Sequence, residues 1–124
     1  MSNQPSEQDE NAKLTAAERI WHTIALVPAG TVTSYGKIAD LAGLPGQARY
    51  VAYCLRNTPA SLTLPWHRVL RSNGDIAFKA GTPQANNQRS LLLAEQVLVE
   101  NNRVNMQQFG WAPPLDVLLH QLAF

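Results

Sequence analysis

The sequence of 124 residues is poor in cysteine and in charge: it contains one cysteine, Cys54, and 15% charged residues. A single cysteine excludes an internal disulfide and a four-thiolate metal site, and it suits a reducing cytosol. No apolar run approaches the roughly 20 residues that a membrane-spanning helix needs, and the polar, acidic N-terminus does not resemble a signal peptide. We therefore expect a cytoplasmic protein that uses no membrane, metal or cofactor.

The hydrophobic content of 45% is sufficient for one folded domain of this length. Residues 1–13 lack apolar periodicity, which predicts a disordered acidic tail. Periodic segments occupy residues 14–111, and an apolar extension over residues 112–124 is expected to dock as a short helix. The sequence therefore predicts one domain, expected to be a monomer, with an additional segment at each end.

The net charge of +1 conceals a segregation of charge along the chain. Acidic residues outnumber basic ones by four to one over residues 1–18, and basic residues outnumber acidic ones by five to one over residues 37–71. The basic residues of the second segment are Lys37, Arg49, Arg56, Arg68 and Arg71. Such a stripe suits a polyanionic partner, because each phosphate contact is local. An ordinary solvated surface explains the stripe equally well.

Two short helices joined by a glycine-containing turn are predicted in the same region. Ser34 is a good N-cap for a helix over residues 35–42, and the turn over residues 43–46 separates it from a helix over residues 48–56. This arrangement is typical of a helix-turn-helix, although two neighbouring helices of any bundle give the same pattern. The arginines at both ends of the second helix favour the helix-turn-helix.

The remaining pattern predicts a mostly α domain of the α/β class, similar to a winged helix. Its other expected elements are a helix opened by a Thr15–Glu18 capping box, a hairpin with an Asn-Gly turn joining residues 69–70 to 76–78, a helix from Thr82-Pro83 to about Glu95, and a small hairpin over residues 97–104. The two hairpins are expected to supply the strands of this domain.

Four segments combine into one specific pattern: Val32-Thr-Ser-Tyr-Gly-Lys-Ile-Ala39, Leu41-Ala-Gly43, Ala48-Arg49 and Leu64-Pro-Trp-His-Arg-Val69. This pattern resembles the C-terminal DNA-binding domain of O6-alkylguanine-DNA alkyltransferases, whose active-site motif is Pro-Cys-His-Arg. Trp66 stands at the position of the reactive cysteine. With Glu95 and the Phe109-Gly-Trp111 ending, this substitution resembles the alkyltransferase-like proteins, which retain the lesion-binding fold and lack the acceptor thiol. The resemblance covers about residues 15–111.

The chemistry of alkyl transfer requires a thiolate that a neighbouring base activates. An indole offers only an N–H donor, so Trp66 cannot accept an alkyl group in place of that thiolate. The resemblance places His67 and Glu95 at the relay positions of the active family, where they have nothing to activate. Cys54 lies inside a predicted helix and is expected to be a small buried hydrophobe. We therefore predict a binding protein rather than an enzyme, and for His67 and Arg68 we favour a structural role.

The resemblance also implies specific roles in DNA binding. Trp66 and Pro65 would line a lesion pocket, with Lys79 near the purine. Tyr35 would press on the phosphate of the target nucleotide, and Arg49 would enter the stack in place of the flipped base, a role that suits a planar cation. The residues expected to contact DNA are Ser34, Tyr35, Ala48, Arg49, Arg56 and Arg68. The plainer alternatives are core packing for Trp66, an ordinary tyrosine at the boundary of the core for Tyr35, and a solvated helix start for Arg49.

Three positions depart from the pattern of the family. Thr58 occupies the place of an asparagine that precedes a proline, and Asn57 comes one residue early. Tyr50 and Tyr53 replace small residues in the expected recognition helix. Either the two tyrosines point away from DNA, or this chain sits on DNA differently.

The resulting hypothesis is a protein that binds duplex DNA from the minor groove and flips an O6-alkylated guanine into a pocket lined by Trp66. The resemblance implies that it flags the lesion for nucleotide excision repair proteins without transferring the alkyl group. One alternative is an active alkyltransferase that uses another acceptor. The other is a transcription regulator whose helix-turn-helix reads undamaged sequence in the major groove.

Overall fold

The computed structural model describes residues 14–124, which form a mostly helical domain with a small sheet, as expected. The elements are α2 (Ala16–Ala25), β1 (Thr33–Ser34), α3 (Tyr35–Leu41), α4 (Ala48–Arg56), the 3-10 helix η1 (Trp66–Arg68), β2 (Val69–Leu70), α5 (Pro83–Ala94), α6 (Met106–Phe109) and α7 (Leu115–His120). The predicted acidic tail over residues 1–13 lies outside the described residues. Within residues 14–124, every helix is too short or too polar to cross a membrane.

Local capping determines where the main helices begin. The Thr15 hydroxyl accepts from the Glu18 amide at 3.1 Å, and the Glu18 carboxylate accepts from the Thr15 amide at 3.0 Å, which completes the predicted capping box. Ser34 caps α3 by accepting from the Lys37 amide, and Thr82 caps α5 with a proline at the first helical position. These caps confirm the predicted helix starts.

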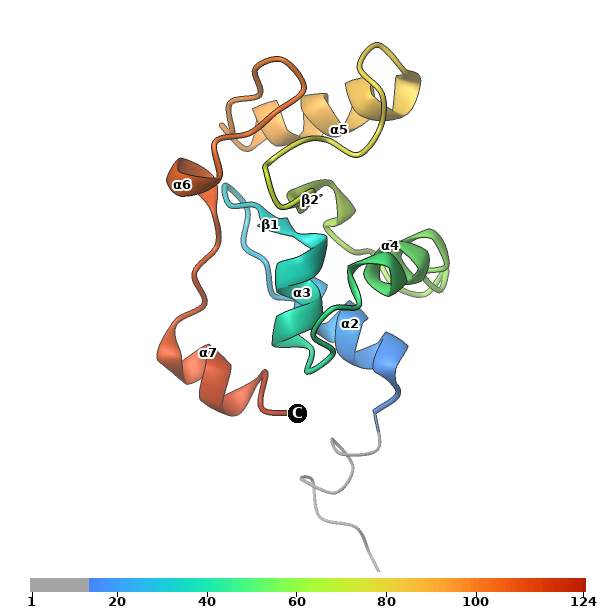
Figure 1. Ribbon diagram of the computed structural model, residues 1–124, viewed down its shortest axis with the longest axis vertical. Coiled ribbons are helices and arrows are strands. Elements are labelled where there is room, and N and C mark those ends of the chain that lie inside the picture. The colour runs from blue at the N-terminus through green and yellow to red at the C-terminus, as the bar shows by residue number, and fades with distance from the viewer. Residues whose placement is uncertain (1–13) are drawn as a thin grey trace, which may run out of the picture.

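The helices pack around two apolar cores. The first core lies among α2, α3 and α4 and includes Ile20, Ile24, Ile38, Val51 and Cys54. The second lies beneath α5 and the loops around it and includes Leu70, Ile76, Leu92, Val97 and Val104. Figure 1 shows the short strands β1 and β2 between the group of α2, α3 and α4 on one side and α5 on the other. The strands therefore join the two cores into one body.

The pairing of the strands differs from the prediction. β1 and β2 pair in parallel, with Thr33 opposite Val69 and Ser34 opposite Leu70, so the expected hairpin between residues 69–70 and 76–78 is wrong. The Asn-Gly turn does form, because the Arg71 carbonyl accepts from Gly74. Both β2 residues are fully buried, and pairing with β1 satisfies backbone groups of β2 that the core would otherwise leave without a partner.

The chain after the turn pairs with a distant segment instead. Asp75 forms an antiparallel bridge with Arg103, and a Cβ at Gly74 would lie 2.1 Å from the Val104 carbonyl oxygen, so only glycine permits this approach. The expected hairpin over residues 97–104 is reduced to one bridged pair, Glu100 and Arg103, across the turn residues Asn101 and Asn102. Both asparagines have positive φ, as a tight hairpin turn requires.

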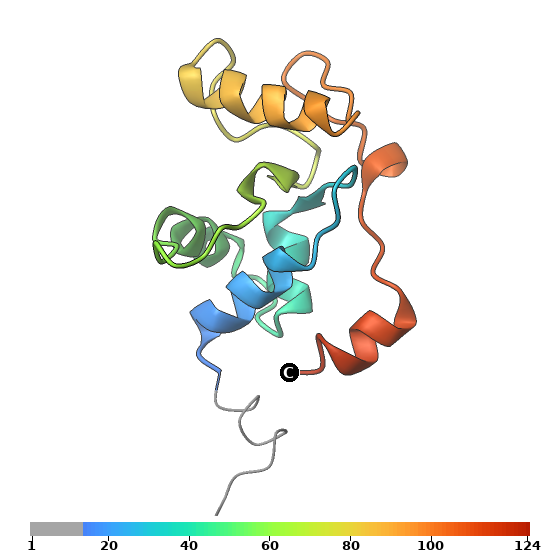
Figure 2. The ribbon, with the colours of Figure 1, turned by 180° about the vertical axis from the view of Figure 1, so that it is seen from behind.

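The C-terminal extension docks on the first helix, as its apolar character predicts. Both views place α7 at the same end of the molecule as α2 and α3 (Figures 1 and 2). Leu122 is buried in the first core, the His22 ring bonds the Gln121 carbonyl at 2.8 Å, and Phe124 packs against His22 and Arg19. The extension therefore completes the core around α2.

Candidate nucleic-acid interface

A groove of about 870 Å³ opens between α4, η1, the loop after β2 and the start of α5. Its wall is largely apolar and is formed by Ala52 and Leu55 of α4, Trp66 of η1, and Ala77 and Phe78 of the loop. The rings of Trp66 and Phe78 meet edge to face, with centroids 6.4 Å apart and planes at 81°. The groove is therefore concave, has aromatic side chains in its wall and is large enough to hold a nucleobase.

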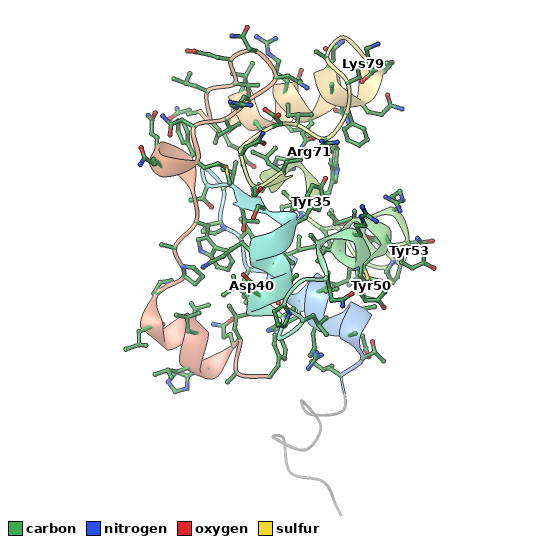
Figure 3. The ribbon with its side chains drawn as sticks, viewed as in Figure 1. Tyr35, Asp40, Tyr50, Tyr53, Arg71 and Lys79 are labelled. Atoms are coloured by element: carbon green, nitrogen blue, oxygen red, sulfur yellow. The ribbon has the colours of Figure 1, made fainter. Side chains whose placement is uncertain are left out.

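Tyr35 stands at one side of this groove, at the first residue of α3. Figure 3 shows Tyr35 and Arg71 next to one another, facing the space between α4 and α5. Burial raises the pKa of Tyr35, and the positive charges of Arg71 and Arg56 act in the opposite direction. The hydroxyl therefore stays protonated at neutral pH and can donate a hydrogen bond to a phosphate.

Three arginines supply positive charge around the groove. Arg49, Arg56 and Arg71 line it, all three are exposed, and within residues 14–124 none of their guanidinium groups forms an ion pair or hydrogen bond with the protein. None of the described residues that line this groove is acidic. The charge segregation predicted for residues 37–71 therefore appears in space as a basic rim on an apolar pocket, a combination suited to a phosphate backbone with an extruded base.

The 3-10 turn that carries Trp66 is held by a partly buried group of hydrogen bonds around Glu95, here called the clamp. The Arg68 guanidinium donates to both carboxylate oxygens, with Nε 2.9 Å from Oε1 and Nη2 2.5 Å from Oε2, and its Nη1 donates to the Val27 carbonyl at 2.7 Å. His67 Nε2 donates to Oε2 at 2.9 Å, and the Gly30 amide donates to Oε1 at 3.3 Å. The two residues after Trp66 are therefore both fastened to one carboxylate.

The electrostatics of this clamp are strong. The Arg68 guanidinium beside Glu95, helped by His67 and the Gly30 amide, lowers the pKa of the carboxyl from 4.5 to about 2, although partial burial opposes the shift. The Glu95 side chain is only 16% exposed. For His67 and Arg68 this geometry favours the structural alternative, and the guanidinium of Arg68 is not available to a phosphate while it is clamped.

Gln88 is a second fastening that sequence patterns did not reveal. Its side chain is 2% exposed, and its amide donates to the carbonyls of His67 and Val69 at 3.0 and 3.2 Å. It therefore ties α5 to both ends of the segment that follows Trp66. A buried glutamine on a helix is uncommon, but nothing in the local sequence identifies its partners.

The structure brings together only part of the predicted site. Trp66, Tyr35, Arg49, Ala48 and Arg56 all line the groove. Phe78, Arg71, Gln84 and Asn87 also line it and were not among the predicted site residues. They come from the loop after β2 and from α5, so their proximity to α4 depends on the parallel strand pairing that local patterns did not predict.

The other predicted residues lie outside the groove. Pro65 caps η1 without lining the groove, and Ser34 is buried as the cap of α3. Lys79 lines a neighbouring hollow of about 1210 Å³ between residues 71–79 and 98–109, and Figure 3 shows it near the start of α5. Within residues 14–124 no group of histidine, cysteine, aspartate and glutamate side chains has an arrangement that could hold a metal ion.

The departures at the end of α4 have a local explanation. The Thr58 hydroxyl donates to the Leu55 carbonyl at 2.9 Å and to the Cys54 carbonyl at 3.3 Å, and the Asn57 amide donates to the Tyr53 carbonyl at 2.8 Å. Both side chains therefore donate to carbonyls in the last turn of α4, and the Thr58 hydroxyl gives the Leu55 carbonyl a partner there. Together they can connect α4 to the loop that leads to Trp66.

Comparisons with known proteins agree with this geometry. Residues 15–97 match the family described as 6-O-methylguanine DNA methyltransferase, DNA binding domain. A curated relative, the DNA base-flipping protein of Escherichia coli K12, is 38% identical over 108 residues, which is 86% of this chain and 82% of the relative. The chain belongs to the alkyltransferase-like family. Alkyltransferase-like protein 1 of Schizosaccharomyces pombe, 27% identical over 100 residues, spans 77% of this chain and 93% of its own.

Solved structures extend the likeness to three dimensions. A crystal structure of S. pombe Atl1 in complex with damaged DNA containing O6-carboxymethylguanine has a TM-score of 0.71 and 26% identity, and covers 79% of this chain and 95% of its own. A DNA complex of the Mycobacterium tuberculosis methyltransferase has a TM-score of 0.56 and 30% identity, and covers 75% of this chain and 52% of its own. With Trp66 at the cysteine position, this alkyltransferase-like chain is a non-catalytic relative of the methyltransferases, as predicted.

Proposed function

We propose that this protein binds duplex DNA through α4 from the minor groove and holds an O6-alkylated guanine, flipped out of the helix, in the groove lined by Trp66. The observation that carries the proposal is the position of Trp66: an indole forms a wall of the pocket, edge to face with Phe78, where the methyltransferase motif has its thiol. The names of the S. pombe and E. coli relatives support the same reading.

The energetics of the site fit a reversible lesion binder. Flipping a base costs a few kcal/mol, and least for a base that already pairs badly. An apolar wall stabilises the complex by roughly 0.8 kcal/mol for each methylene of the alkyl group that it buries. Arg56 and Arg71 hold the phosphate backbone at the mouth of the pocket, and the salt dependence of binding reports their contribution, while Arg49 enters the stack in place of the flipped base.

Alkyl transfer has no acceptor in this proposal. The sole thiol, Cys54, is 1% exposed in the first core, and burial raises its pKa, so it is neither accessible nor ionised. His67 and Glu95 keep the geometry of a relay but act as the clamp that orients the turn carrying Trp66. The bound lesion therefore stays intact, and we propose that the complex recruits nucleotide excision repair proteins in the cytoplasm.

The proposal is tested with a duplex that carries O6-methylguanine next to 2-aminopurine, whose fluorescence rises when its neighbour leaves the stack. Wild type is expected to raise the fluorescence and to leave the methyl group on the recovered DNA. Trp66→Ala is expected to bind the lesion duplex on the order of tenfold more weakly, because the aromatic wall is lost. Trp111→Phe, at a tryptophan of the first core that does not line the groove, serves as the control for loss of a tryptophan.

The alternatives give different results in the same assay. A radiolabelled methyl group that appears on the protein would identify an alkyltransferase with another acceptor. Tight binding to one undamaged sequence, with indifference to O6 alkylation and no fluorescence change, would identify a transcription regulator. Either result would contradict the proposal.

A further inference from the structure

The exposed face of α4 carries a ridge that the lesion pocket does not use. Arg49, Tyr53 and Arg56 are spaced by four and three residues, so their side chains follow one another along the same face of the helix. Tyr53 is 53% exposed and does not line the groove, whereas the two arginines do. The ridge therefore lies at the edge of the groove, on the surface from which DNA would approach.

The ring of Tyr53 is braced by a neighbouring ring. Its ring stacks on that of Tyr50, with centroids 6.0 Å apart and planes at 13°. Tyr50 is itself half-buried and packs against the first core, and Figure 3 shows the two tyrosines together on α4. A braced aromatic ring loses little conformational entropy when a partner covers it, which is the property that makes tyrosine effective at interfaces.

The surroundings of this ring favour a polyanion. The sequence of α4, Ala48–Arg56, contains no acidic residue, and within residues 14–124 the arginines on either side of Tyr53 have no carboxylate partner. A surface that pairs cations with an exposed aromatic ring is complementary to a sugar-phosphate chain, in which charged phosphates alternate with apolar deoxyribose faces. These observations favour one binding partner for the ridge, a strand of the DNA whose groove α4 enters.

We propose that Tyr53, braced by Tyr50, packs against the deoxyribose wall of the minor groove beside the gap that Arg49 fills. This inference rests on the proposed function. One helical turn separates Tyr53 from Arg49, about 6 Å along the axis, and a minor groove is about 6 Å wide. A tyrosine ring one turn away from a side chain that enters the stack therefore meets the groove wall and holds the groove open. The departure from small residues at these positions then has a function.

The test compares hydroxyl-radical footprints, because these radicals cut at deoxyriboses that are accessible in the minor groove. An O6-methylguanine duplex and its undamaged twin are titrated with wild type, Tyr53→Ala, Tyr53→Phe and the control Leu119→Ala, which removes an exposed leucine of α7. Tyr53→Ala is expected to bind on the order of tenfold more weakly and to lose protection at the sugars next to the lesion. Tyr53→Phe, which keeps the ring, is expected to stay within about twofold of wild type with the full footprint.

Two results would overturn the inference: Tyr53→Ala with unchanged affinity and footprint, or weaker binding with an unchanged footprint, which would locate the loss away from the sugars. Circular dichroism melts of each variant verify that the helix is folded before binding is measured. Failure of the proposed function has a separate signature, namely equal affinity of wild type for damaged and undamaged duplex. In that case the difference in affinity and footprint between wild type and Tyr53→Ala is still measured on the undamaged duplex.

Discussion

Replacing Glu95 with glutamine removes the charge that fastens Arg68 and His67 behind Trp66 while keeping the shape of the side chain. The carboxylate receives hydrogen bonds from Arg68, His67 and the Gly30 amide, and its pKa falls from 4.5 to about 2. A pKa lowered from 4.5 to about 2 corresponds to a stabilisation on the order of 3 kcal/mol, because each tenfold change in the proton dissociation constant is worth about 1.36 kcal/mol. Because the side chain is only 16% exposed, solvent screens little of this energy.

Glu95→Gln is therefore expected to lower the free energy of unfolding by about 2–3 kcal/mol at pH 7, which corresponds to a fall in Tm on the order of 10 °C. The turn that carries Trp66 loosens at the same time, so binding of an O6-methylguanine duplex should weaken as well. Thermal and urea unfolding measure the first effect. The matched control is Glu100→Gln, which neutralises an exposed carboxylate outside the clamp and is expected to change stability by less than about 0.5 kcal/mol.

The pH dependence has a definite sign. A carboxyl whose pKa is lower in the folded state contributes its full stability above the unfolded value near 4.5, and loses it as the pH falls toward 2. The difference in unfolding free energy between wild type and Glu95→Gln should therefore shrink from pH 5 to pH 2. Equal unfolding free energies of Glu95→Gln and wild type at pH 7 would refute the account of the clamp. So would a difference between their unfolding free energies that stays constant from pH 5 to pH 2.

Three other predictions address DNA binding and the C-terminal extension. Arg49→Ala should weaken binding of the lesion duplex at fixed salt without creating a sequence preference, and a shifted sequence preference would contradict its role in filling the stack. Tyr35→Phe should bind more tightly than Tyr35→Ala if the ring itself displaces the phosphate, whereas equal losses would assign the effect to the hydroxyl. Leu122→Ala should cost about 2–4 kcal/mol in urea unfolding because it opens the first core. Leu119→Ala, 58% exposed, should be nearly neutral, and equal costs would contradict the docking of the extension.

Local chemistry explains what the sequence allowed us to predict. Helix starts depend on side chains within one turn, so the caps at Thr15, Ser34 and Thr82 were all confirmed. The position of Trp66 within a motif indicated the binding wall, and the groove contains it. These features needed no knowledge of distant contacts.

Long-range pairing explains what could not be predicted. The apolar residues on both sides of the Asn-Gly turn favour a hairpin, but β2 pairs with β1 instead. The paired residues Thr33 and Val69 are 36 positions apart in the sequence. That pairing brings the loop with Phe78 and Arg71 over α4, so both residues join the groove. Arg71 was expected only as part of the basic stripe, and no local signal indicated Phe78. The same limit applies to Gln88, whose partners are two backbone carbonyls of a remote segment.

The most direct test of the central claim is one equilibrium titration at a fixed salt concentration, with matched duplexes that contain guanine, O6-methylguanine or a bulkier O6-alkylguanine. The account predicts tighter binding to both damaged duplexes than to the undamaged one, with the alkylated base recovered unchanged. Equal affinity for all three duplexes, or loss of the alkyl group from the DNA, would contradict it.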